Sequence, residues 1–164
     1  GVSGGSYGGY AAAWMATFYT KKFAASVMFV GISNKVSKAG TTDIAQEEYH
    51  VHTRQRAWDD WDKLFKASPI KYVTQAETPL LIMHGENDTR VHPGQAMEIY
   101  RHLKLIGKAA VRLVFFKGEG HGNRRAASRL DYCLRHIRWM EHYLKNGGKE
   151  IPTKSVDYKK VWDQ

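Results

Sequence analysis

The sequence opens on a glycine-rich stretch, GVSGGSYGGY, which contains the pattern G-x-S-x-G in two overlapping registers, centred on Ser3 and on Ser6. This pattern is typical of a sharp turn between a strand and a helix, in which a serine is exposed above a sheet. An apolar, alanine-rich segment over residues 10–20 follows and predicts a buried helix. Such a start favours a fold in which a strand and a helix pack closely around one serine.

The two registers differ in the helix that would follow each serine. A helix directly after Ser3 would have to contain four glycines, at about 1 kcal/mol for each internal glycine. Ser6 instead has Gly4 and Gly8 at the two positions where small residues let strand and helix approach. The sequence therefore predicts Ser6 as the exposed serine and places Ser3 in the strand that leads to the turn.

Strand-like and helix-like segments alternate after this turn, which is the pattern of an α/β fold with a mainly parallel sheet flanked by helices. Continuous apolar runs predict strands that are buried on both faces. These strands are expected over residues 26–32, 78–85 and 111–116.

Helices are expected between and after these strands, and one segment shows no clear period. The expected helices cover residues 58–67, 93–106 and 124–145, whereas residues 33–56 are expected to form a loop with a short helix. Pro93 and Gly107 suit the start and the end of the second of these helices. We expect a domain over residues 1–148 and a polar C-terminal tail over residues 149–164.

The last predicted helix carries an apolar face expected to pack on the core: Leu130, Leu134, Ile137, Met140 and Leu144. Its arginines are expected on a solvated face, and its Cys133, the single cysteine of the chain, as a buried free thiol.

The composition is ordinary for a globular domain, with 164 residues, 43% hydrophobic residues and a formal net charge of +9. The basic residues are scattered or lie on the last helix, without the stacking aromatics or the module that nucleic-acid binding requires. No apolar run approaches the ~18–20 residues that span a bilayer. Neither a nucleic acid nor a membrane is therefore expected as a partner.

Candidate partners for Ser6 lie just after two of the predicted strands. Asp88 ends the run His84-Gly85-Glu86-Asn87-Asp88, and His121 lies in the loop Gly118-Glu119-Gly120-His121-Gly122. In parallel sheets the carboxyl ends of the strands gather such groups at one edge. A serine becomes a nucleophile when a histidine removes its proton and an acid orients that histidine. The chain order Ser6, Asp88, His121 is that of α/β-hydrolases.

Other acidic residues and histidines offer no better site. Those in helical stretches are expected on solvated faces or away from strand ends: Asp59, Asp60, Asp62, Asp131 and His136. Glu86 and Glu119 share the two loops but offer no better orientation of a base. His84 and His92 are expected to pack or hydrogen-bond, and contact with a substrate is the alternative for them. His50 and His52 could bind a metal through alternate residues, but no further ligand stands at a diagnostic spacing. No metal and no cofactor is expected.

Three motifs together closely resemble the prolyl oligopeptidase family of serine peptidases, in particular its acylaminoacyl-peptidase and dipeptidyl-peptidase branches: Gly4-Gly5-Ser6-Tyr7-Gly8-Gly9-Tyr10, His84-Gly85-x-x-Asp88 and Gly118-Glu119-Gly120-His121-Gly122. The resemblance implies the C-terminal part of an α/β-hydrolase domain, behind a β-propeller that restricts access to oligopeptides. It implies Ser6 as the nucleophile, Asp88 as the acid, His121 as the base and the backbone N–H of Tyr7 as one oxyanion donor. The second donor, the propeller and the first strands of the hydrolase sheet lie upstream in this family and have no counterpart here.

These expectations amount to a serine peptidase that hydrolyses oligopeptides through an acyl-enzyme. The alternatives are an esterase or lipase on the same fold, and a non-catalytic interaction domain that retains the triad. Loss of one oxyanion donor costs ~10²–10³ in rate, so the isolated chain is expected to be nearly inactive. With the first strands absent, residues 26–32 are expected to form a bare sheet edge, which favours a homo-oligomer, a strand exchange or instability.

Overall fold

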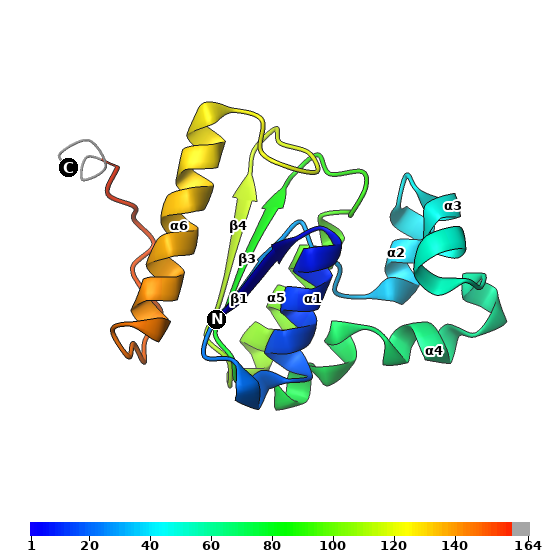
Figure 1. Cartoon of the computed structure of the whole chain (residues 1–164), viewed down its shortest axis with the longest axis horizontal. Helices are drawn as coiled ribbons and strands as arrows, with labels where there is room; N and C mark the ends of the chain where they lie inside the picture. Colours follow the sequence, from blue (N-terminus) through cyan, green and yellow to red (C-terminus); the bar gives the residue numbers. More distant parts are fainter. Residues whose placement is uncertain (159–164) are drawn as a thin grey trace.

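Four parallel strands lie side by side in chain order, β1-β2-β3-β4. They are β1 Val2–Gly5, β2 Ser26–Phe29, β3 Leu80–Gly85 and β4 Val111–Phe116. The register places Met28 opposite Gly4 and Ile82, and Ile82 opposite Leu113. All four carboxyl ends therefore lie at one edge of the sheet (Figure 1). The structure is a computed structural model and describes residues 1–158.

Helices cover both faces of the sheet (Figure 1). Helices α1 Tyr7–Thr17 and α5 Gly94–Ile106 pack on one face, where Ala13, Met28, Ile82 and Ile99 share a core. Helix α6 Ala126–Leu144 packs on the other face, with Trp139 in a second core. The structure is thus the predicted α/β architecture, with a wholly parallel sheet flanked by helices.

The free edge of the sheet differs from the prediction. Residues 26–32 were expected to form a bare edge, but β2 pairs with β1 on one side and with β3 on the other. The residues leading into the Ser6 turn form the strand β1, and β1 is one of the two edge strands, with β4 at the other edge. The prediction overlooked this pairing because Val-Ser-Gly-Gly carries little intrinsic preference for a strand.

Helix α6 faces the sheet with a stripe that matches the predicted one only at Met140, which packs against the second core. Trp139 and Tyr143 are buried, whereas Ile137 is 55% exposed and Leu144 is 46% exposed. Cys133, predicted to be buried, is exposed as well. The helix carries two apolar stripes with the same period, and the aromatic one fits against the apolar face of the sheet.

The segment between β2 and β3 is more helical than expected. Residues 33–56 contain α2 Lys35–Thr41, α3 Ala45–Glu47 and a π-helical turn, η2 Glu48–Thr53. The predicted helix over residues 58–67 divides into a 3₁₀ turn, η3 Ala57–Asp59, and α4 Trp61–Lys66. Helices α2, α3 and α4 project sideways from the rest of the fold (Figure 1).

Several boundaries agree closely with the sequence. Helix α5 ends at Gly107, which adopts φ +73 as a terminating glycine does. Strand β4 has the predicted bounds, whereas β2 ends three residues early and α1 begins three residues early, directly after Ser6. Two short 3₁₀ segments, η1 Thr20–Lys22 and η4 Pro69–Gln75, complete the fold.

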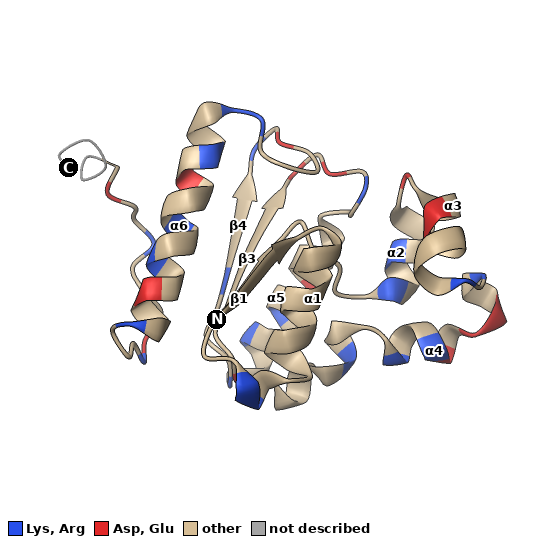
Figure 2. Cartoon of the chain, in the orientation of Figure 1, with Lys and Arg blue, Asp and Glu red and all other residues tan. Residues whose placement is uncertain are grey.

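Basic side chains are distributed over several helices rather than gathered on one surface (Figure 2). On α6 and β4, three arginines donate hydrogen bonds to backbone carbonyls of residues 152–155: Arg112, Arg135 and Arg138. Part of the predicted tail thus lies along the helix, and residues 159–164 of that tail fall outside the described residues. Within residues 1–158, no helix has the length and apolar character needed to cross a bilayer.

Candidate active site

Ser6 is the single residue between β1 and α1, and its backbone is strained. Strand β1 ends at Gly5 and α1 begins at Tyr7. Ser6 itself has φ 57 and ψ −118, a conformation that costs a residue with a Cβ about 1–3 kcal/mol. This abrupt turn places the Ser6 hydroxyl at the carboxyl edge of the sheet, as in a nucleophile elbow.

The turn depends on a close backbone contact at Gly4. A Cβ added to Gly4 would lie 2.5 Å from the carbonyl carbon of Gly8, a distance that real Cβ atoms essentially never show. A Cβ added to Gly8 would meet nothing within 4 Å. The two glycines, which the sequence interpretation treated alike, therefore differ: the strand glycine is required, and the helix glycine supplies the backbone against which it packs.

Ser6, His121 and Asp88 form a continuous series of hydrogen bonds. Ser6 Oγ lies 2.8 Å from His121 Nε2, and His121 Nδ1 lies 2.8 Å from Asp88 Oδ2. Because a carboxylate only accepts, Nδ1 carries the imidazole hydrogen and Nε2 is left to accept from the serine hydroxyl. The structure thus brings together the three residues that the sequence singled out, in the geometry of a general base beside a nucleophile.

Asp88 is held as a buried carboxylate. Its Oδ1 accepts from the backbone N–H groups of Arg90 and Val91, at 3.0 and 2.9 Å, while its Oδ2 faces His121 and His84. Burial alone would raise the pKa of Asp88, but the hydrogen bonds from His121, His84 and Val91 hold that pKa well below its usual value. The acid is therefore ionised at neutral pH and can orient the imidazole.

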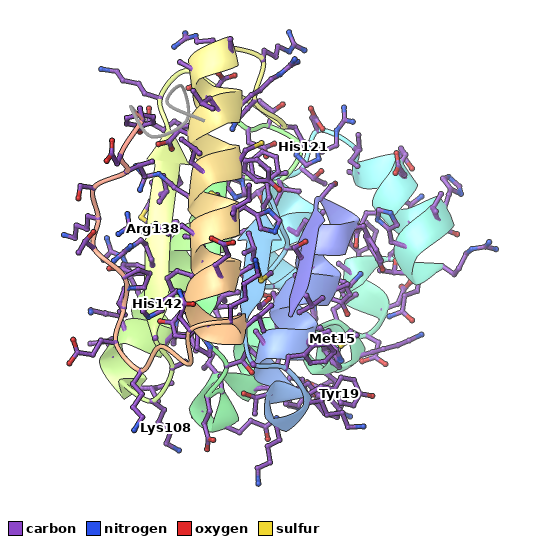
Figure 3. The ribbon with its side chains drawn as sticks, turned by 60° about the vertical axis from the view of Figure 1, so that its left-hand side comes forward. Met15, Tyr19, Lys108, His121, Arg138 and His142 are labelled. Atoms are coloured by element: carbon purple, nitrogen blue, oxygen red, sulfur yellow. The ribbon has the colours of Figure 1, made fainter. Side chains whose placement is uncertain are left out.

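A cavity of about 570 Å³ opens beside His121 between the loops that follow β3 and β4. Asn87, Arg90, Glu119 and Arg124 are among its lining residues. A second cavity, of about 480 Å³, is lined by residues that include Tyr19 and Lys108. Figure 3 shows that Tyr19 and Lys108 lie at the opposite end of the fold from His121, so only the first cavity adjoins the hydrogen-bonded series.

Comparison with known proteins identifies the family. A model described as "Prolyl oligopeptidase family" matches residues 1–147. The chain belongs to the prolyl oligopeptidase family. This confirms the resemblance seen in the three motifs.

Its relatives in this family are peptidases. The uncharacterized peptidase YuxL of Bacillus subtilis is 36% identical over 150 residues, which cover 88% of this chain and 22% of YuxL. The human acylamino-acid-releasing enzyme is 31% identical over 149 residues, which cover 87% of this chain and 20% of the enzyme. Dipeptidyl-peptidase 5 of Porphyromonas gingivalis is 30% identical, over 88% of this chain and 22% of its own length.

Solved structures agree with this assignment. The acylaminoacyl peptidase of Pyrococcus horikoshii superposes with a TM-score of 0.81 at 26% identity, over 98% of this chain and 26% of that one. The fold is therefore part of an α/β-hydrolase peptidase domain. The chain spans about a fifth of the length of the curated relatives named above.

His84 directly contacts Asp88, the acid predicted from the sequence. Its Nε2 lies 2.7 Å from the Val91 carbonyl and 3.2 Å from Asp88 Oδ2. Since the carbonyl can only accept, Nε2 carries the hydrogen and donates it to Val91, with Asp88 Oδ2 close beside it. His84 is fully buried and its Nδ1 has no hydrogen-bond partner. This arrangement agrees with the packing or hydrogen bonding that the sequence predicted for His84. His92, for which the same was predicted, accepts from the Gly94 N–H.

The loop that carries His121 is anchored through Glu119. The buried Glu119 carboxylate accepts from the backbone N–H groups of Arg124 and Arg125, at 2.8 and 3.1 Å. The backbone carbonyl of Glu119 accepts from the Asn87 N–H, which joins this loop to the loop that carries Asp88. The hydrogen bond from the Arg124 N–H, with others, lowers the pKa of Glu119. Glu119 therefore holds the histidine loop, whereas Asp88 is the carboxylate that contacts His121.

Tyr7, the residue that the family resemblance implies as an oxyanion donor, begins α1. The N–H groups of a first helical turn have no carbonyl one turn earlier to bond. They also lie at the positive end of the helix dipole, which favours a negative charge nearby. Tyr7 thus has a position suited to the predicted role, directly after Ser6.

The remaining candidates lie elsewhere. Asp60 caps α4 by accepting from the Lys63 N–H, and Asp131 pairs with Arg135 on α6. His52 bonds Glu48 rather than forming a pair with His50. Among residues 1–158, no group of three or more histidine, cysteine, aspartate or glutamate residues could hold a metal ion.

Proposed function

We propose that the polypeptide containing this chain is a serine peptidase that hydrolyses peptide bonds of oligopeptides through an acyl-enzyme. The observation that carries the proposal is the hydrogen-bonded series from Ser6 Oγ through His121 to Asp88, with both contacts at 2.8 Å. The family relatives, an acylamino-acid-releasing enzyme and a dipeptidyl-peptidase among them, support peptide bonds as the substrate class.

The proposed chemistry follows from the hydrogen-bond directions. His121 Nε2 takes the proton of Ser6 as Oγ attacks the scissile carbonyl carbon, and the leaving amine then receives that proton. Asp88 keeps the imidazole hydrogen on Nδ1 and stabilises the imidazolium that forms. The Tyr7 N–H stabilises the negative oxygen of the tetrahedral intermediate. Water then attacks the carbonyl carbon of the acyl-enzyme while His121 takes its proton. Ser6 Oγ receives that proton as the bond to the acyl group breaks and the acid product leaves.

A turnover assay on the full-length polypeptide tests this function. Hydrolysis of short chromogenic peptides should be lost in Ser6→Ala and retained in Ser3→Ala. The matched serine belongs to the other register of the same motif, so it controls for changes to the turn. Peptide hydrolysis that survives Ser6→Ala, or fails equally in both variants, would contradict the proposal.

The same assay separates the alternatives. A peptidase should cleave peptide bonds as well as esters of matched sequence, whereas an esterase or lipase should cleave only the esters. An interaction domain that merely retains the triad should cleave neither. The isolated 164-residue chain should turn over both substrates at least 10²-fold more slowly than the full-length polypeptide, because it supplies only one predicted oxyanion donor.

We also propose that the edge of β1 pairs with further β-structure, either from the rest of the polypeptide or from a second copy of this chain. Strand β1 is paired on one side only, with β2, and an open edge presents free backbone donors and acceptors. The isolated chain should accordingly dimerise or aggregate. A stable monomer at low concentration by light scattering would count against this pairing.

A further inference from the structure

A buried cluster of charged side chains lies beside the nucleophile turn. Lys35 and Lys38 of α2 are 4% and 1% exposed, and Glu48, which begins η2, is 4% exposed. Lys38 Nζ lies 2.5 Å from Glu48 Oε2, and His52 Nδ1 lies 2.8 Å from the same oxygen. Buried charges are costly unless they are paired. Unlike charges on a solvated surface, these buried charges therefore call for a structural or functional explanation.

Lys35 connects the cluster to Tyr7. Its Nζ lies 3.2 Å from the Tyr7 hydroxyl oxygen, and it also lies 5.0 and 4.9 Å from the ring centroids of Tyr7 and Tyr10. The Tyr7 ring contacts the His52 ring as well, at 4.6 Å between centroids. The residue that follows the nucleophile is therefore held by its side chain on two sides.

The pairing within the cluster is uneven. Glu48 Oε2 has two close partners, whereas Oε1 has no hydrogen bond and lies 3.7 Å from Lys35 Nζ. Burial would raise the pKa of Glu48, but its hydrogen bond with Lys38 and the other neighbouring groups lower it overall. Glu48 is thus a carboxylate shared by two ammonium groups, and Lys38 is the closer of the two. Lys35 is left with the Tyr7 hydroxyl as its hydrogen-bonded partner in the cluster.

We propose that Lys35 is a positioning residue: by donating a hydrogen bond to the Tyr7 hydroxyl and packing on its ring, it fixes the backbone N–H of Tyr7 where the oxyanion forms. This proposal rests on the proposed function. The Tyr7 N–H follows Ser6 directly. A small displacement of such a donor weakens its hydrogen bond to the oxyanion, because that bond depends on distance and direction. Since an ammonium can only donate, the Tyr7 hydroxyl oxygen is the acceptor of this bond, and Tyr7 as a whole is 41% exposed.

The same cluster disfavours the metal site considered for His50 and His52. His52 Nδ1 is engaged by Glu48, and two ammonium groups surround that carboxylate. A metal cation bound at His52 would be repelled by these two positive charges and would have to compete with them for Glu48. The histidine therefore completes the support of Tyr7 instead of forming a ligand pair.

Steady-state kinetics of variants in the full-length polypeptide test the proposal. Lys35→Met should lower kcat on a chromogenic peptide by on the order of 10- to 100-fold and leave KM within about twofold, because the donor acts mainly in the transition state. Tyr7→Phe, which keeps the ring and the N–H but loses the hydroxyl, should lower kcat less. The double variant should be no slower than Lys35→Met alone, because both changes break one bond.

Lys38→Met is the matched control. Lys38 is buried, carries the same charge and pairs with the same Glu48, but its ammonium contacts that carboxylate rather than Tyr7. Both lysine variants should lower the thermal midpoint, whereas only Lys35→Met should lower kcat. Lys35→Arg, which retains a cation and donors, should recover part of the loss and guards against a Lys35→Met variant that fails to fold.

The outcomes separate this inference from the function on which it rests. If wild type shows no Ser6-dependent turnover, the proposed function fails and the inference fails with it. If wild type is active but Lys35→Met and Lys38→Met lose kcat equally, or Lys35→Met and Tyr7→Phe combine additively, Lys35 only stabilises the fold and the inference alone is overturned.

Discussion

Asp88 and His121 reach the candidate site from loops, whereas Ser6 reaches it from a turn of a single residue. On the loop side, hydrogen bonds to Asp88 and to Glu119 hold the geometry, and most of them come from backbone N–H groups. On the Ser6 side, a strained backbone is held by the contact between Gly4 and Gly8. One side is defined by satisfied donors and acceptors, and the other by the absence of a side chain.

This difference predicts different responses to substitution. A change on the loop side should alter chemistry and pH dependence while the fold survives, since other hydrogen bonds remain in each loop. A change on the Ser6 side should first alter stability, because the backbone contact leaves no room to adjust.

The largest effect should come from Asp88→Asn on the loop side. An amide can donate to His121 Nδ1 and so favour the wrong tautomer, and the loss of kcat should be about 10⁴-fold. Asp43→Asn is the matched control, because Asp43 is an exposed acid that contacts Thr89 and Arg90 of the same loop. A loss of less than tenfold in Asp88→Asn would show that this acid does not orient the base.

On the Ser6 side, Gly4→Ala and Gly8→Ala should change stability in opposite directions. The added Cβ at position 4 meets the Gly8 backbone, which should cost about 3 kcal/mol of unfolding free energy. The added Cβ at position 8 meets open space in α1, where alanine is favoured over glycine by up to about 1 kcal/mol. Urea unfolding of the two variants measures both, and equal destabilisation would contradict the contact described here.

A smaller, pH-dependent effect should follow from His84→Leu. The depressed pKa of Asp88 contributes stability above the unfolded value of about 3.9 and loses it as pH falls toward the folded value. Removing the His84 donor raises the pKa of Asp88, so the variant loses part of this contribution at pH 5.

The deficit of His84→Leu relative to wild type should therefore stay constant above the folded pKa of Asp88 in the variant, and shrink as pH falls through that pKa. His84→Gln, whose amide can place a donor near the position of Nε2, should show a smaller pH-dependent deficit. Urea unfolding at a series of pH values provides the measurement. A deficit that does not shrink at any pH down to acid unfolding would mean that His84 supports the fold but not the ionisation of Asp88.

The sequence predicted the loop side of the site well because its signals are local. Asp88 and His121 each follow an apolar run that forms a buried strand, and parallel pairing brings such residues to one edge. The bounds of β4 and the end of α5 at Gly107 were likewise predictable from short sequence patterns.

The Ser6 side was less predictable because its support is distant in the sequence. The motif identified the turn, but the buried pairing of Lys35 with Glu48 has no periodic apolar signature, and residues 33–56 therefore resembled a loop. Burial of a lysine runs against the usual preference of that residue type. The pairing of β1 and the stripe that α6 buries were also decided by tertiary contacts rather than by local preference.

Ser6, activated by His121, is the proposed nucleophile. Labelling of the full-length polypeptide with a fluorophosphonate, followed by peptide mapping, tests this most directly. A single adduct on Ser6 is expected, which forms fast in wild type and in Ser3→Ala and much more slowly in His121→Ala. An adduct on Ser3, or labelling of Ser6 at an unchanged rate without His121, would contradict it.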